Sequence, residues 1–211
     1  MNQAFWTTKR ATGSLLVAGL FIALVALLIL LVSGAIQVFA AALQGALEEM
    51  APFADTFRLL TLMWAISLFV QLLGFGLLTQ LLLRAGASQL PIVAFTLVSF
   101  ALLAGMLHGT FHMSVEPWAA ETAARTGSIP AAYEPLRIWI AATFRLGYVA
   151  HLVAVAGFGW AILRTRLLAP WLGWTATGWS VLWLLGNLVG VGAPGIILIM
   201  PAIIGVALLW R

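Results

Sequence analysis

Cysteine and charged residues are what this sequence has least of. Its 211 residues include no cysteine, and only 8% of them are charged. A water-soluble domain has about a quarter of its residues charged, so the composition excludes a soluble globular protein. The absence of cysteine excludes disulfides, thiolate metal sites, thioether-linked haem and cysteine nucleophiles.

Hydrophobic residues make up 64% of the chain and gather in six long runs. A bilayer core about 30 Å thick needs about 20 apolar residues per helix, and the runs are close to that length or longer. The sequence therefore predicts an all-α polytopic membrane protein, with six transmembrane helices in one bundle and a single membrane domain over residues 1–211. The expected spans are residues 14–44, 58–83, 90–113, 137–163, 167–187 and 194–210.

The first run resembles a secretory signal, because Lys9 and Arg10 precede it. Its apolar part continues from Leu15 to Phe39, whereas the apolar region of a signal has about 7–15 residues. We therefore expect an uncleaved helix. A helix of this length must tilt, project from the membrane or bend near Gly34.

The two signs of charge are separated along the chain. All acidic residues fall in two short stretches, Glu48, Glu49 and Asp55 in the first and Glu116, Glu121 and Glu134 in the second. The opposite junctions carry only basic residues, namely Lys9, Arg10, Arg84, Arg164, Arg166 and Arg211. Short loops rich in Lys and Arg stay on the cytoplasmic side, so both termini are expected to be cytoplasmic. The partner implied is the lipid bilayer with its anionic headgroups, and not nucleic acid.

Glycines recur at positions expected for helix contacts. Gly186 and Gly190 form a Gly-x-x-x-Gly pair, and Gly74 and Gly157 lie in the middle of predicted spans. Small residues let helix backbones approach closely in lipid. Contacts within the bundle are the main expectation, and a membrane protein partner or a homo-oligomer that packs on such faces is the alternative.

His108, His112 and Glu116 are each separated by four residues. On an α-helix they lie along one face, with about 40° of drift per step. Two imidazoles one turn apart followed by a carboxylate are a candidate site for a divalent metal, zinc or iron. The alternative is that the two histidines bind neighbouring carbonyl groups while Glu116 is solvated.

The third histidine is expected at a different depth. Counting along the helices places His151 about 18 Å and His108 about 27 Å from the inner face. This mismatch argues against bis-histidine haem, whose axial ligands sit at one depth. It also argues against an intramembrane zinc hydrolase of the ceramidase type, which uses three histidines and an acid.

Arg145 is predicted to lie within a span, level with His108. Such charges usually face the bundle interior or a wet cavity, although a long side chain can also extend to the interface. Tyr148 follows one turn later, and Glu116 or Glu134 is the nearest expected counter-charge. Arg145, Tyr148 and His108 are therefore the predicted ligand-binding residues of an outward-facing polar vestibule.

Two hypotheses for function follow. In the first, the protein is not an enzyme and binds a partner or a small ligand at this vestibule. In the second, it is a metal-dependent membrane enzyme that uses His108, His112 and Glu116. No catalytic motif for nucleophilic hydrolysis or phosphate binding is present.

The last third of the chain resembles a bacterial family of six-helix membrane proteins that is defined only as a domain of unknown function. The resemblance rests on Arg164-Thr165-Arg166, on Pro170-Trp171-Leu172-Gly173-Trp174 with Gly178, and on the closing Leu208-Leu209-Trp210-Arg211. It implies the fold and a location in the bacterial cytoplasmic membrane. No activity comes with it.

Overall fold

The computed structural model describes residues 3–38, 47–188 and 197–210, and most of these residues are helical. Within this part of the chain there are seven α-helices, one 3₁₀ segment and one π-helical turn. They are α1 (Gln3–Val32), η1 (Leu47–Phe53), α3 (Ala54–Arg84), α4 (Leu90–Thr110), η2 (Phe111–Val115), α5 (Glu116–Thr126), α6 (Tyr133–Thr165), α7 (Pro170–Leu188) and α8 (Ile199–Leu209). The all-α prediction is confirmed.

Among the described residues, four helical stretches are long and apolar enough to cross a membrane, judged by length and composition. They are Phe5–Val32, Glu49–Arg84, Leu90–Thr126 and Tyr133–Thr165. The remaining two helices are shorter, with 19 residues in α7 and 11 in α8. Part of the sixth expected span, residues 194–196, lies outside the described residues.

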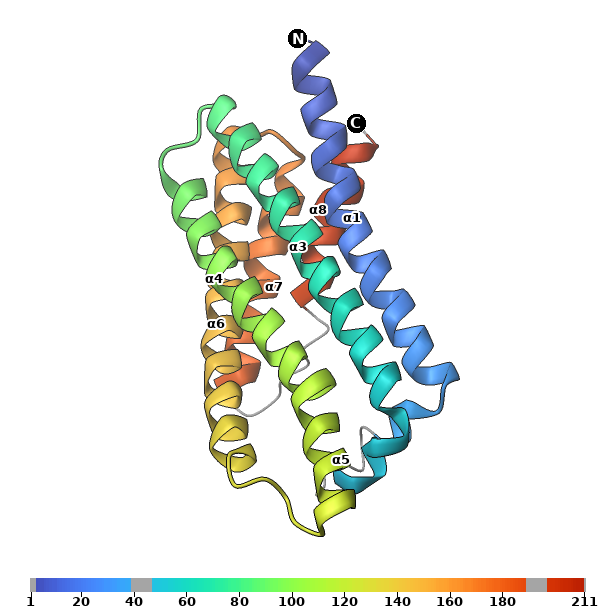
Figure 1. Ribbon diagram of the computed structural model, residues 1–211. Coiled ribbons are helices and arrows are strands. Elements are labelled where there is room, and N and C mark those ends of the chain that lie inside the picture. The colour runs from blue at the N-terminus through green and yellow to red at the C-terminus, as the bar shows by residue number, and fades with distance from the viewer. Residues whose placement is uncertain (1–2, 39–46, 189–196, 211) are drawn as a thin grey trace.

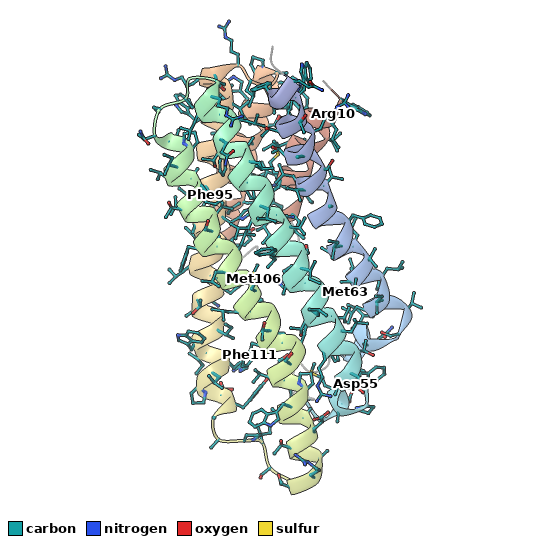
Figure 2. The ribbon with its side chains drawn as sticks, turned by 45° about the horizontal axis from the view of Figure 1, so that its top comes forward. Arg10, Asp55, Met63, Phe95, Met106 and Phe111 are labelled. Atoms are coloured by element: carbon teal, nitrogen blue, oxygen red, sulfur yellow. The ribbon has the colours of Figure 1, made fainter. Side chains whose placement is uncertain are left out.

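The helices run side by side along a common axis (Figure 1). Helix α3 packs against α1 and α4, α6 packs against α4 and α7, and α8 packs against α1. The N- and C-termini lie at one end of the bundle, and α5 lies at the opposite end (Figure 1). Arg10 lies near the first end and Asp55 near the second (Figure 2). We call them the basic end and the acidic end, because the predicted separation of charges follows this axis.

The outside of the bundle is apolar. Large hydrophobic side chains such as Phe21, Leu28, Leu146 and Leu182 are each at least 58% exposed. Extensive exposed apolar surface marks contact with a membrane or with another protein. The exposed side chains are spread over several helices, as lipid contact requires.

Helix ends differ from the predicted spans in two places. Helix α1 ends at Val32, and Gly34 has a φ of 75°, so the chain bends near the glycine where a bend was expected. The helix predicted to end at residue 113 instead continues through the π-turn η2 into α5 and ends at Thr126. Pro117 does not stop it, because proline is tolerated in the first turn of a helix, and here that is the first turn of α5.

Two pairs of glycines bring helix backbones into direct contact. A methyl group added at Gly13 of α1 would lie 2.7 Å from the carbonyl oxygen of Gly205 in α8. One added at Gly173 of α7 would lie 2.6 Å from the carbonyl oxygen of Gly159 in α6. Only a residue without a side chain permits such an approach. These glycines therefore serve contacts within the chain.

Gly74 and Gly157, two of the glycines singled out from the sequence, also pack inside the bundle. A methyl group at Gly74 would meet Leu16 of α1, and one at Gly157 would meet Ala94 of α4. Gly190 lies outside the described residues.

A candidate site at the acidic end

The three predicted metal ligands lie on one continuous helical rod formed by α4, η2 and α5. His108 is in the last turn of α4, His112 is in the π-turn, and Glu116 begins α5. Single π-helical turns inside α-helices are rare and frequently occur at functional sites. In this turn, Nδ1 of His112 lies 2.9 Å from Oε2 of Glu116.

Tyr133, the first residue of α6, completes the surroundings of Glu116. Its hydroxyl group donates a hydrogen bond to Oε1 of Glu116 at 3.1 Å, and its ring stacks on Phe111 with centroids 5.8 Å apart. Glu116 is only 3% exposed. Both carboxylate oxygens of a buried acid therefore have a polar neighbour, as the burial of such a group requires.

His108 has a different environment. Its ring stacks on Phe144 of α6 with centroids 3.9 Å apart, and it meets the ring of His112 edge-on at 4.4 Å. Its Nδ1 atom is buried and has no hydrogen-bond partner among the described residues. We call His108, His112, Glu116 and Tyr133 the outer polar cluster, and His108 is its member with an unused polar atom.

Ion pairs at the protein surface surround this cluster. Arg58 of α3 contacts Asp55 at 2.8 Å and Glu121 of α5 at 3.0 Å, which links the two helices. Within α6, Arg137 contacts Glu134 at 2.6 Å. Exposed pairs of this kind add little stability. Together they bring two arginines into contact with three of the acidic residues at this end.

The residues predicted to line a vestibule differ in their exposure. Arg145 is exposed on the outside of α6, whereas Tyr148 is only 6% exposed. Residues three apart on a helix differ by only about 60° in direction, so the boundary between the buried and the exposed face of α6 runs between these two side chains. The expected counter-charges are engaged elsewhere, since Glu116 contacts His112 and Tyr133, and Glu134 contacts Arg137.

The predicted metal ligands share one helical rod, but they do not converge as a three-ligand group. Across residues 3–38, 47–188 and 197–210, no three His, Asp or Glu side chains come together in a group that could hold a metal ion. In the outer polar cluster, Nδ1 of His112 already faces Glu116. His151 lies elsewhere, 1% exposed and edge-on to Phe75 at 6.2 Å, in line with its predicted difference in depth.

Sequence reasoning missed Tyr133 and Phe144. Tyr133 is one of only two tyrosines and precedes a long apolar run directly. Aromatic residues with a polar group are enriched where a helix enters the membrane interface. That signal was present, but it could not show that the hydroxyl group would reach Glu116.

Comparison of the chain with known protein families, with curated proteins and with solved structures finds no match. The resemblance of the last third to a bacterial six-helix family therefore stays a prediction.

Proposed function

We propose that the protein crosses a bacterial cytoplasmic membrane six times, with its basic end in the cytoplasm. The apolar exterior and the four long helices support membrane insertion. The position of both termini at the basic end supports an even number of crossings. Loops rich in Lys and Arg are retained in the cytoplasm, and the acidic end then faces outward.

Cysteine labelling tests this orientation with a matched pair of variants. Ser128 and Ser88 are both exposed and lie in loops at the acidic and the basic end. Because the chain has no cysteine, Ser128→Cys and Ser88→Cys each introduce the only thiol. In intact cells, a membrane-impermeant maleimide is expected to label Ser128→Cys and not Ser88→Cys. The reverse pattern would overturn the orientation.

We further propose that the protein is not an enzyme and binds a small polar ligand at the outer polar cluster. The observation that carries this proposal is His108, whose buried Nδ1 lacks a partner in the described residues while it stacks on Phe144. A buried polar atom without a partner destabilises the protein by about 1–3 kcal/mol. Such a cost is retained where the atom serves binding.

Replacing His108 with phenylalanine tests this role. The aromatic stack on Phe144 can persist, and the unpartnered nitrogen is removed, so the ligand-free variant should be as stable as the wild type or more stable. His112→Phe is the control and should be destabilised, because it removes the contact with Glu116. Thermal unfolding in detergent measures both. A loss of stability in His108→Phe equal to that of the control would mean that His108 is structural.

Native mass spectrometry of the same preparations tests ligand binding directly. A small-molecule adduct is expected on the wild-type protein and not on His108→Phe. An adduct of equal occupancy on both proteins would place the ligand elsewhere.

Arg145 is better explained as an interfacial anchor than as a ligand-binding group. It is exposed on the lipid-facing side of α6, beside Leu146. Leucine is favoured over arginine inside a membrane by about 3 kcal/mol at the helix centre, and by less nearer the interface. Arg145→Leu should therefore leave the melting temperature in nanodiscs unchanged or raise it. A larger loss than in Arg137→Leu, which breaks an exposed ion pair, would show that Arg145 has a buried partner.

The metal-dependent enzyme remains the second candidate. The close approach of the His108 and His112 rings beside Glu116 favours it, since two imidazoles and a carboxylate suit zinc or iron. Elemental analysis of purified protein separates the two functions. Stoichiometric zinc or iron that is lost in the double variant His108→Ala, His112→Ala would favour the enzyme, and metal-free wild-type protein would exclude it.

A further inference from the structure

The middle of the bundle contains polar side chains that the outer polar cluster does not explain. Gln71 of α3 is fully buried, His151 of α6 is 1% exposed and Tyr148 of α6 is 6% exposed. Both amide atoms of Gln71 and the hydroxyl group of Tyr148 are buried without a hydrogen-bond partner in the described part of the chain. The ring nitrogens of His151 are buried without a well-aligned hydrogen bond there, although the imidazole lies close to the backbone of Ile197. Buried polar groups almost always have a partner, which can be a protein group, water or an ion.

These three side chains lie at similar depths. His151 contacts Phe75 of α3 edge-on, with ring centroids 6.2 Å apart. Gln71 lies one helical turn before Phe75, toward the acidic end, and its side chain passes over Gly19 of α1. Tyr148 precedes His151 by about one turn on the same helix, also toward the acidic end. With a rise of about 1.5 Å per residue, all three fall within roughly two turns of one another.

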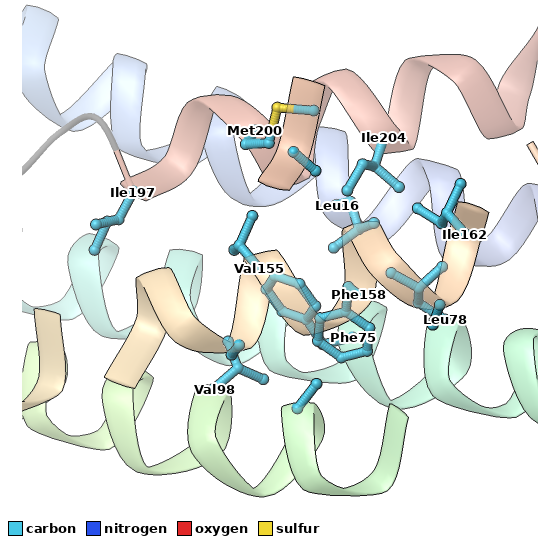
Figure 3. Close-up of a cluster of buried hydrophobic side chains, with 14 of the residues drawn as sticks. Leu16, Phe75, Leu78, Val98, Val155, Phe158, Ile162, Ile197, Met200 and Ile204 are labelled. Atoms are coloured by element: carbon cyan, nitrogen blue, oxygen red, sulfur yellow. The ribbon is translucent and has the colours of Figure 1, made fainter. Parts of the chain in front are cut away.

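A layer of large apolar side chains lies on the basic side of this level. The rings of Phe75 and Phe158 stack with centroids 5.2 Å apart. Val155 and Leu78 lie beside these rings, in the cluster that Figure 3 shows. This layer separates Gln71 and His151 from the basic end.

Aromatic and polar side chains lie between this level and the acidic end. Tyr148 lies next to Phe144, with ring centroids 6.3 Å apart, and Phe144 stacks on His108. His108 belongs to the outer polar cluster. Aromatic and polar groups therefore continue from the level of His151 to the acidic end. Toward the basic end, the packed apolar layer around Phe75 and Phe158 lies in the way.

We propose that Gln71, Tyr148 and His151 line a hydrated internal site that binds a small uncharged polar molecule, of which water is the smallest, and that opens toward the acidic end. An amide, a phenol and a neutral imidazole each both donate and accept hydrogen bonds. None of them carries a permanent charge, which suits an uncharged ligand. A buried water needs two to four polar partners, and these side chains offer that number.

Deuterium oxide is the probe for the hydration of this site. In the absence of native cysteine, Tyr148→Cys, His151→Cys and Val155→Cys each carry one thiol, whose S–H stretching band is visible by infrared spectroscopy. Val155 is the control, because it lies on the same helix at the apolar layer and is 2% exposed. After proteoliposomes are transferred to deuterium oxide, the thiols should exchange in the order Tyr148→Cys, His151→Cys, Val155→Cys. The first two should exchange at least about ten times faster than the control, and equal rates would overturn the proposal.

A second test leaves Tyr148 and His151 intact. Gln71→Met keeps the approximate volume of the side chain and removes its polar atoms. If the amide binds water or a ligand, the melting temperature should fall relative to Leu68→Met, a control at another fully buried position of α3. A melting temperature equal to or above that of the control would show that the amide is dry and would contradict the proposal. Both tests are independent of ligand binding at the outer polar cluster.

Discussion

Replacing Glu116 with alanine is expected to lower the free energy of unfolding by about 3–5 kcal/mol, the range found when one partner of a buried pair is removed. Glu116 is 3% exposed and lies between His112 and Tyr133. Without the carboxylate, the Tyr133 hydroxyl group loses its acceptor, and the His112 imidazole loses the oxygen that lies 2.9 Å from its Nδ1 atom. Unfolding in mixed micelles, followed by tryptophan fluorescence, measures the change.

Glu121→Ala is the matched control for this prediction. Glu121 also lies on α5, but its side chain is 34% exposed, and its contact with Arg58 is a surface ion pair. Its removal should change stability little, because exposed pairs are screened by solvent. Tyr133→Phe should give an intermediate loss of about 1–3 kcal/mol, since one hydrogen bond to the carboxylate is removed. A Glu116→Ala variant as stable as Glu121→Ala would show that the outer polar cluster does not hold the acidic end together.

Replacing Gly173 with alanine is expected to destabilise the contact between α6 and α7 by about 1–3 kcal/mol, as overpacking does in well-packed interiors. The added methyl group would lie 2.6 Å from the carbonyl oxygen of Gly159 and 2.5 Å from Cγ of Leu163. A side chain can adjust, but the backbone carbonyl group can move only if the two helices separate. The melting temperature in detergent should fall accordingly.

Gly178→Ala provides the comparison on the same helix. No atom lies within 4 Å of a methyl group added there. Alanine is a better helix former than glycine by about 1 kcal/mol, so this variant should be as stable as the wild type or more stable. Equal destabilisation of Gly173→Ala and Gly178→Ala would mean that α7 resists substitution generally and not at the glycine contact.

Sequence alone determined the helical class and the separation of charge between the two ends. Both depend on properties that are local in the chain: the length of an apolar run and the sign of the charges that follow it. The bend near Gly34 could also be foreseen, because glycine readily adopts a positive φ. The end of the third helix could not be foreseen from the sequence. The helix continues past Met113 through the π-turn, and the proline that follows is tolerated in the first turn of α5.

The candidate site was predictable only where it lies on one helical rod. His108, His112 and Glu116 are spaced by helical turns, so the sequence was sufficient to align them. The contacts of Tyr133 with Glu116 and of Phe144 with His108 join α6 to that rod, and they depend on how the two helices pack. The same packing decided that Arg145 faces outward while Tyr148 faces inward. A sequence gives the angle between two residues on a helix, but the neighbouring helices determine which side of that helix is buried.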